Sequence, residues 1–284
     1  MATKLIHLSD LHVGGHEEPS IEAPLRELVE GLQPELIVAS GDLTHRGTPD
    51  QHARAAAFLQ GLGPTVLAVP GNHDIPYRVA ARLTRPWREF ESRWGTTEPI
   101  FSSTGLHVVG VNSARPWRHQ SGGLDAAALE RAAARLGEAE AGALRVVCLH
   151  HHLTGAPWRS HKRPVARRGH VLGALVDAGA ELILSGHIHQ SGASERREFE
   201  VGLGGERSVT MVIAPGLGQP RPNRRGEARG LHVIECDEKD IAVETLAFVD
   251  GTFTQIASRS FPRRTRPLPH TAMSSPDTSG GQSL

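Results

Sequence analysis

The feature that most constrains this chain is the tetrapeptide 71–74, Gly-Asn-His-Asp, which follows the apolar run 65–69 and Pro70. An apolar run of this length predicts a buried strand, and the Pro-Gly pair ends it. The tetrapeptide then presents an amide, an imidazole and a carboxylate at the carboxyl end of that strand. Ligands bind at this edge in open α/β sheets, although Gly, Asn and Asp are also common in ordinary turns.

Four other expected strands, 4–9, 35–39, 144–149 and 181–184, end in side chains of the same kinds. Across all five strand ends the candidate metal ligands are Asp10, His12, Asp42, Asn72, His150, His187 and His189. Nitrogen and oxygen donors without a thiolate suit Mn²⁺, Fe or Zn²⁺ rather than a structural zinc site. Seven ligands exceed the needs of one ion, whereas two ions that share a carboxylate would use them all.

Expected strands and helices alternate along residues 1–190, which is typical of an α/β sheet. Residues 191–261 are instead expected to be rich in strands, at 196–214, 230–236, 240–248 and 252–257. We interpret residues 1–261 as a single domain. The composition of residues 262–284 is dominated by Pro, Ser, Thr, Gly and Arg, which predicts a disordered tail.

Composition limits the partners and the location of this chain. The 31 basic and 31 acidic residues cancel, so no global field attracts nucleic acid or a membrane. The 17 histidines, against one tyrosine, are in excess and favour metal ligation or acid–base chemistry. Cys148 and Cys236 lie in apolar runs and are expected to be buried thiols. Neither a signal peptide nor a membrane span is evident, so we expect a cytoplasmic protein.

The ordered motifs resemble the calcineurin-like metallophosphoesterase superfamily, whose signature is Asp-x-His, Gly-Asp, Gly-Asn-His-Asp/Glu, His and Gly-His-x-His. The resemblance implies a four-layer α/β/β/α sandwich with two mixed sheets flanked by helices. It also implies a binuclear metallophosphoesterase with two divalent metal ions, of which Mn²⁺ is preferred and Fe or Zn²⁺ are alternatives. A hydroxide held between the ions would be the nucleophile of this hydrolase.

The resemblance also implies a role for each residue. One ion would be held by Asp10, His12, Asp42 and His189, and the other by Asp42, Asn72, His150 and His187. His73 would contact the phosphoryl oxygen and either stabilise charge or protonate the leaving group. Asp74 would orient His73.

The fourth motif departs from the family pattern, because His150, His151 and His152 stand where relatives have His-His-Pro or His-x-Pro. We take His150 as the ligand because it is the first histidine after the strand. If the strand continues, His151 faces the other way and packs or touches substrate. The absence of the proline leaves the path of this loop open.

Within the superfamily the chain is similar to the bacterial cyclic-nucleotide and glycerophosphodiester phosphodiesterase branch, through segments 41–47 and 69–76 and through Asn112 at a strand end. A phosphodiesterase acting on a cyclic nucleotide or small diester is therefore the main prediction. The alternative is a manganese-dependent endonuclease that cuts single-stranded DNA. A non-catalytic scaffold is disfavoured because every expected ligand position is filled.

Substrate contacts are expected from loops that leave the ligand edge, at His45, Arg46, Asn112 and His119. In segment 75–97 arginines alternate with aromatic residues. This pattern is found on nucleotide-binding surfaces, but it is more often an amphipathic helix with one packed face. Oligomeric state is left open by the sequence.

Overall fold

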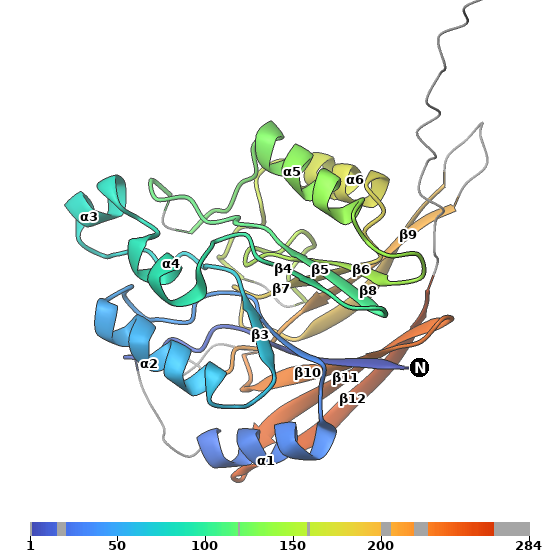
Figure 1. The fold of residues 1–284 in the computed structure, drawn as a ribbon, viewed down its shortest axis with the longest axis horizontal. Helices are drawn as coiled ribbons and strands as arrows, with labels where there is room; N and C mark the ends of the chain where they lie inside the picture. Colours follow the sequence, from blue (N-terminus) through green and yellow to red (C-terminus); the bar gives the residue numbers. More distant parts are fainter. Residues whose placement is uncertain are drawn as a thin grey trace, which may run out of the picture.

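The computed structural model describes residues 2–15, 21–118, 120–157, 160–199, 206–218 and 227–263. Within these ranges two six-stranded mixed sheets pack face to face, and helices cover their outer faces (Figure 1). The α/β/β/α arrangement expected from the motifs is therefore confirmed.

The first sheet has the order β12-β11-β10-β1-β2-β3. Its strands are β1 (Thr3–Leu8), β2 (Leu36–Ala39), β3 (Thr65–Ala68), β10 (Gly230–Cys236), β11 (Asp240–Val249) and β12 (Thr252–Pro262). Strands β1, β2 and β3 are parallel to one another, whereas β10 pairs antiparallel with both β1 and β11. The parallel part carries three of the five ligand-bearing strand ends at one edge.

The second sheet has the order β4-β5-β6-β7-β9-β8. Its strands are β4 (Ile100–Ser102), β5 (Leu106–Gly110), β6 (Leu144–Cys148), β7 (Leu182–Ser185), β8 (Gly192–Phe199) and β9 (Glu206–Ile213). Strands β5, β6, β7 and β9 are parallel, and antiparallel β4 and β8 form the two edges. The other two ligand-bearing strand ends, those of β6 and β7, belong to this sheet.

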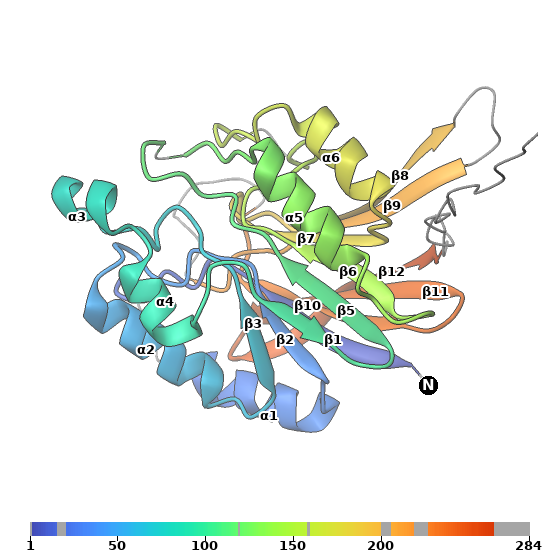
Figure 2. The same cartoon turned by 45° about the horizontal axis from the view of Figure 1, so that its top comes forward.

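Six helices complete the layers (Figure 2). They are α1 (Glu22–Leu32), α2 (Pro49–Gln60), α3 (Val79–Thr84), α4 (Arg88–Trp94), α5 (Ala126–Leu136) and α6 (Arg168–Asp177). Helices α1, α2 and α4 pack on the first sheet, and α5 and α6 pack on the second. None of the helices in the described ranges is long and apolar enough to cross a membrane.

Three apolar clusters correspond to the three contacts between layers. The central cluster lies between the sheets and joins residues such as Leu36 and Val38 to Val146 and Leu184. All four of these side chains are completely buried, which is why both sheets have long apolar runs in sequence. Cys148 lies in the same cluster, and Cys148 and Cys236 are buried free thiols, as expected.

The strand-rich part of the chain does not form one meander. Residues 196–214 were expected as one strand, but they contribute to two antiparallel strands, β8 and β9, which join the second sheet. Strands β10, β11 and β12 join the first sheet instead. Residues 191–261 are therefore divided between both sheets, and the short edge strand β4 was not anticipated.

Segment 75–97 forms two short helices instead of one amphipathic helix. Helix α4 buries Phe90, but α3 buries none of its residues. The prediction of a packed face is thus confirmed for α4 and is wrong for α3. Figures 1 and 2 both show α3 at the edge of the molecule, apart from the sheets.

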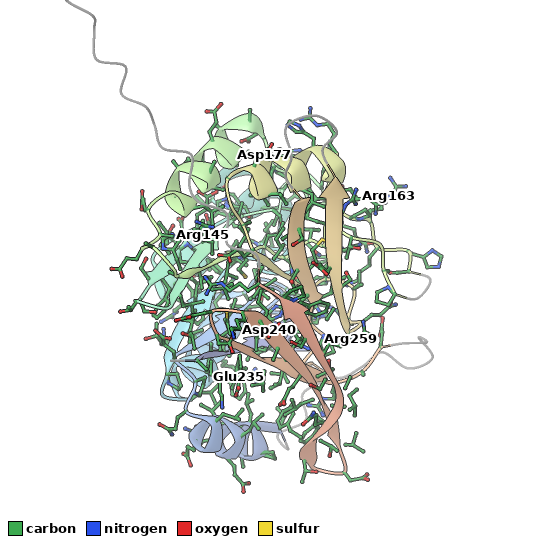
Figure 3. The ribbon with its side chains drawn as sticks, turned by 90° about the vertical axis from the view of Figure 1, so that its right-hand side faces the viewer. Arg145, Arg163, Asp177, Glu235, Asp240 and Arg259 are labelled. Atoms are coloured by element: carbon green, nitrogen blue, oxygen red, sulfur yellow. The ribbon has the colours of Figure 1, made fainter. Side chains whose placement is uncertain are left out.

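At the end of the sheets remote from the ligand loops, Glu181 joins both sheets. Its Oε2 accepts a hydrogen bond from the backbone N–H of Arg145 in β6 at 3.1 Å. Its Oε1 accepts one from Nε of Arg263, which follows β12, at 3.0 Å. Figure 3 shows this side of the molecule, with Arg145 labelled. Arg263 therefore belongs to the fold, and the rest of the expected tail, 264–284, lies outside the described residues.

Two histidines, His7 and His232, stack between strands β1 and β10 with ring centroids 6.0 Å apart. Nε2 of His232 bonds to the carbonyl oxygen of Ile213 at 3.0 Å, and its Nδ1 lies 3.2 Å from Oγ1 of Thr245. Burial lowers the pKa of His232 to about 4. The ring is consequently neutral in the folded protein at pH values where an unfolded chain would protonate it.

We predict that His232 makes the fold sensitive to acid. Below pH 6.5 the unfolded chain binds the proton and the folded chain does not, so the free energy of unfolding falls as pH falls toward 4. Between pH 7.5 and 5 wild type should lose about 2 kcal/mol more than His232→Gln. Urea denaturation of both proteins with EDTA at the two pH values measures this difference. Equal pH dependence would contradict the assignment.

Candidate metal centre

The structure brings the seven candidate ligands together from five strand ends, at the carboxyl edge of both sheets. Asp10 and His12 follow β1, Asp42 follows β2 and Asn72 follows β3, whereas His150 follows β6 and His187 and His189 follow β7. Six of the seven side chains are buried, with His12 half-buried. The convergence expected from the sequence is therefore observed.

The first group contains Asp10, His12 and His189. Oδ1 of Asp10 lies 3.0 Å from Nε2 of His189 and 3.7 Å from Nε2 of His12. The two Nε2 atoms lie 3.1 Å apart. Three donor atoms at these separations surround a space of the size that one cation occupies.

The second group meets at His150, which lies with Asp10 and Asp42 in one ligand cluster and with His151 and His187 in another. Nε2 of His150 lies 3.1 Å from Nδ1 of His187 and 3.4 Å from Oδ2 of Asp42. The same Oδ2 lies 3.9 Å from Nε2 of His12 in the first group. Asp42 thus lies between the two groups, where a bridging carboxylate would have to be.

Backbone conformation sets these residues apart from the rest of the chain. Among the residues that the structure describes, five of the eight non-glycine residues with positive φ are candidate ligands: Asp10, His12, Asp42, His187 and His189. A side chain in this left-handed region costs conformational energy, and such residues gather at functional sites. Strands β1, β2 and β7 thus turn sharply at their ends, which directs these donor atoms into the centre.

Two glycines allow the ligand loops to approach one another closely. A Cβ on Gly71 would lie 2.1 Å from Oδ1 of Asp42. A Cβ on Gly186 would lie 1.8 Å from Oγ of Ser9 and 2.7 Å from Oδ2 of Asp10. The Gly-Asn and Gly-His pairs of the motifs therefore have a steric cause, because no larger residue fits.

Electrostatics hold the two carboxylates of the centre in the charged form that binds metal. Burial raises the pKa of Asp10 and of Asp42, but the neighbouring histidines, chiefly His189 for Asp10 and His150 for Asp42, outweigh burial and hold both pKa values well below their usual range. Burial lowers the pKa of His187 and of His189. The carboxylates are therefore ionised at pH 7, as metal ligation requires.

His150 is oriented by a hydrogen bond from its Nδ1 to the carbonyl oxygen of Ser40 at 2.8 Å. The bond fixes the tautomer and directs Nε2 toward Asp42. Burial lowers the pKa of His150, but the charge of Asp42 raises it to about 9.

The residues of the centre fit two divalent ions, as the unsatisfied buried oxygen atoms of three side chains indicate. Oδ1 of Asp10, Oδ2 of Asp42 and Oδ1 of Asn72 are buried and make no hydrogen bond within the described part of the chain. Unsatisfied buried oxygens are costly, and a cation would satisfy all three. The donor set of carboxylate, amide and imidazole suits the metals expected from the sequence.

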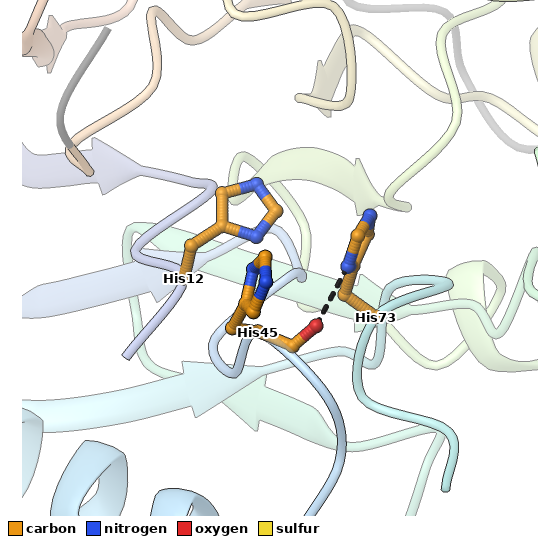
Figure 4. A group of neighbouring side chains, drawn as sticks. All are labelled: His12, His45 and His73. Carbon is orange, nitrogen blue, oxygen red and sulfur yellow. Dashed lines mark hydrogen bonds between the residues drawn. The ribbon is translucent and has the colours of Figure 1, made fainter. Parts of the chain in front are cut away.

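His73 lies at the open side of the centre, beside His12 and His45 (Figure 4). Nδ1 of His73 bonds to the carbonyl oxygen of His45 at 2.8 Å, so Nδ1 carries the proton and Nε2 points away from that carbonyl. Its backbone N–H donates to Oδ1 of Asp42 at 2.8 Å. The catalytic candidate is therefore tied to the bridging candidate through its own main chain.

Asp74 does not contact the imidazole of His73, contrary to the expected role. Its carboxylate accepts hydrogen bonds from the backbone N–H groups of Gly71 at 2.8 Å, Thr44 at 2.8 Å and Leu43 at 3.2 Å. Oγ1 of Thr44 donates to the same carboxylate and lies 3.0 Å from it. Asp74 joins the loop after β2 to the turn after β3, and it positions the backbone that carries His73 instead of the ring.

The four residues expected to contact substrate lie in different environments. His45 stacks beside His73, with ring centroids 5.8 Å apart, and Arg46 is exposed next to it. Asn112 is buried and its Oδ1 accepts a hydrogen bond from the backbone N–H of Ala114 at 3.0 Å, so it shapes its own loop. His119 lies outside the described residues.

His151 was expected to face away from the centre, but it forms a group with His150 and His187. Nδ1 of His151 lies 2.9 Å from Oγ of Ser113, a contact that turns the ring inward. His152 is buried, and burial lowers its pKa to about 4. Strand β6 ends at Cys148, one residue before the expected end at residue 149. The expectation assumed that side chains continue to alternate between the two faces of the strand as far as His151, and they do not.

Lys162 was not among the substrate contacts expected from the sequence. Its Nζ donates to the carbonyl oxygen of His187 and lies 3.4 Å from Nε2 of His189. A cation so near the ligands can contact a phosphoryl group. The one signal for it was rarity, because this chain has three lysines among its 31 basic residues.

Comparisons with known proteins agree with this geometry. A probable cyclic nucleotide phosphodiesterase of Synechococcus sp. is 32% identical over 86 residues, 30% of this chain and 31% of that protein. The chain thus spans about a third of that relative. A 3′,5′-cyclic adenosine monophosphate phosphodiesterase of Haemophilus influenzae is 25% identical over 213 residues, 70% of this chain and 74% of that protein.

A dimetal phosphatase from Danio rerio has a similar fold, with a TM-score of 0.62 and 13% identity over 92% of this chain and 99% of that one. The family model described as calcineurin-like phosphoesterase matches residues 3–191, which contain all five strand-end motifs. The chain therefore belongs to the calcineurin-like phosphoesterase family.

Proposed function

We propose that this protein is a metal-dependent phosphodiesterase with two divalent ions, preferably Mn²⁺, at the candidate centre. The observation that carries the proposal is the position of Asp42, whose Oδ2 lies within 3.4 Å of His150 and 3.9 Å of His12. Asp10, His12, Asp42 and His189 would hold one ion, and Asp42, Asn72, His150 and His187 the other. When bound, two such ions activate water and stabilise charge on a phosphoryl group.

The chain contributes orientation, charge and a proton donor. His73 lies at the open side, where its imidazolium form can donate a hydrogen bond from Nε2 to a phosphoryl oxygen or a proton to the leaving alkoxide. Lys162 adds positive charge from the opposite loop. The hydrogen bonds of Asp74 hold the turn of His73, which limits reorganisation during the reaction.

A small nucleotide diester is the preferred substrate class. Two of the relatives are described as cyclic nucleotide phosphodiesterases, one of them over most of its length. A manganese-dependent single-strand endonuclease is the second candidate, favoured by the exposed Arg46, which directly follows His45. The experiment that tests both is a panel of aryl mono- and diesters, cyclic nucleotides and single-stranded DNA with the Mn²⁺-loaded protein. Absence of hydrolysis of every diester would refute the proposal.

We predict that Asp42→Ala abolishes diester hydrolysis and lowers the bound metal, because both ligand sets lose an oxygen. Metal content measured by mass spectrometry should fall from about two ions per chain to one or fewer. Asp50→Ala is the matched control, since Asp50 is exposed on α2. Retention of both ions and of full activity by Asp42→Ala would exclude a shared ligand.

His73→Ala should keep both ions and lose about 10²–10⁴-fold in turnover, the usual contribution of a positioned acid. Its side chain makes the contact of Nδ1 to the carbonyl of His45, and no other ligand group depends on that contact. His170→Ala, on the exposed surface of α6, is the control. A variant as fast as wild type would remove the proposed role.

Asp74→Asn is expected to lower both stability and turnover. The asparagine amide keeps one acceptor oxygen. Its NH₂ group, however, would face backbone N–H donors that the carboxylate accepts from in the wild-type protein. Burying such mismatched groups should lower the free energy of unfolding by about 2–3 kcal/mol. Thermal and urea denaturation measure this loss, and Asp250→Asn, in an exposed turn, is the control. Unaltered stability would show that the carboxylate does not hold this turn.

A further inference from the structure

An exposed face beside the candidate centre has no role in the chemistry proposed so far. Seven large hydrophobic side chains are exposed in the described ranges: Tyr77, Val79, Leu83, Ile100, Trp117, Val249 and Ile256. Four of them, Tyr77, Val79, Leu83 and Trp117, belong to segment 77–85 around α3 and to the turn 115–118. We call these two segments, together with Arg46, the α3 face.

The parts of the α3 face touch one another. The guanidinium of Arg46 lies over the ring of Tyr77, with Cζ 5.9 Å from the ring centroid. Nε of Arg82 donates a hydrogen bond to the carbonyl oxygen of Pro116, which joins α3 to the 115–118 turn. Trp117 in that turn is 71% exposed and Tyr77 is 63% exposed. Two aromatic rings are therefore held on adjoining segments but are open to solvent.

The α3 face is also continuous with the catalytic candidate. Tyr77 is four residues after His73, and Arg46 directly follows His45, whose carbonyl oxygen holds the His73 ring. A Cβ on Gly47 would lie 2.6 Å from the backbone of Ile75, so the loop after Arg46 lies against the segment that leads to Tyr77. A molecule on the α3 face therefore adjoins the open side of the centre.

Charge on these segments has a single sign. The α3 face, made of Arg46 and residues 77–85 and 115–118, contains six arginines and no Asp or Glu, and one of these arginines, Arg115, pairs with Asp125 just outside the face. The whole chain, by contrast, has 31 acidic and 31 basic residues. Such a segregation is electrostatically complementary to a polyanion and to no neutral or basic partner.

A second copy of this chain is a poor occupant for the α3 face. Two copies related by twofold symmetry would place the same patch on both sides of the contact, so arginines would oppose arginines. A polyanion with flat apolar groups satisfies both features of the face. Single-stranded nucleic acid has that chemistry, because its phosphates bind cations and its unpaired bases stack on aromatic rings.

We propose that the α3 face binds single-stranded oligonucleotides, with bases stacked on Tyr77 and Trp117 and phosphates contacting the arginines. The exposed guanidinium groups available for phosphates are those of Arg78, Arg85 and Arg118. Binding at this face does not require the proposed hydrolysis. Only the further step, delivery of a phosphodiester to the centre, rests on the proposed function.

Binding is tested by fluorescence anisotropy of a labelled twelve-residue oligothymidylate with phosphorothioate linkages, which slow cleavage, on the Mn²⁺-loaded full chain. Trp117→Ala and Tyr77→Ala should each weaken binding about tenfold, the effect of losing one stacked base. Trp117→Phe should recover most of the loss. Each of Arg78→Gln, Arg85→Gln and Arg118→Gln should reduce the slope of log affinity against log salt by about 0.7.

The controls come from the distant strand β12, where Ile256 is 59% exposed and Arg259, labelled in Figure 3, is exposed as well. Ile256→Ala and Arg259→Gln should bind the oligonucleotide as wild type does. Circular dichroism melting confirms the folding of each variant. Wild-type affinity in all face variants, or equal losses in the controls, would overturn the proposal.

Two further outcomes separate this proposal from its alternatives. Hydrolysis of bis(p-nitrophenyl) phosphate by wild type tests the centre alone, so a protein that hydrolyses this diester without binding the oligonucleotide refutes the α3 face and retains the phosphodiesterase. Oligonucleotide binding without diester hydrolysis does the reverse. A dimer in sedimentation that Leu83→Glu converts to monomer would show that the face is a contact between copies, and would also overturn the proposal.

Discussion

The arrangement of the centre depends on one buried residue, Asp42, because its atoms hold three separate loops. Its backbone oxygen accepts a hydrogen bond from the N–H of His12 at 3.0 Å, and its Oδ1 accepts one from the N–H of His73 at 2.8 Å. Its Oδ2 faces Nε2 of His150 from the other sheet. The loops after β1, β2 and β3 and the end of β6 are therefore placed by reference to a single residue, through both its backbone and its carboxylate. Loss of its charge disturbs the geometry as well as the ligand set.

This construction is costly for the protein alone, and the cost explains why a cation fits. Asp10 and Asp42 are completely buried, and burial of a carboxylate disfavours its charged form. Five candidate ligands also have positive φ, which adds conformational strain. Histidines around the carboxylates supply part of the compensation, since they hold both pKa values low. Bound cations would supply the rest of the compensation. Metal binding would therefore account for the backbone strain, the buried charge and the unsatisfied oxygens together.

Much of this site was predictable because its signals are local in sequence. Each ligand follows an apolar strand within a few residues, and parallel strands bring their carboxyl ends to the same edge. The roles of Asp74 and His151 were not predictable, because they depend on partners 30 or more residues away, Thr44 and Ser113. The pairing of β9 with β7 likewise depends on contacts across the sheet and not on periodicity. His52 is likewise buried, with Nε2 bonded to the carbonyl oxygen of Asp74, a partner 22 residues away.

Formal net charge is a poor guide to what this chain binds, because its charges are segregated. Residues 17–30 include five glutamates and one arginine, whereas residues 75–88 include four arginines and no acid. Helix α1 from the acidic segment and α3 from the basic one lie at different edges of the molecule (Figure 1). A polyanion would be repelled from one edge and attracted to the other, which is the edge that adjoins His73. A chain whose net charge is zero can thus orient a charged substrate, because the field comes from the local segregation of charges and not from their sum.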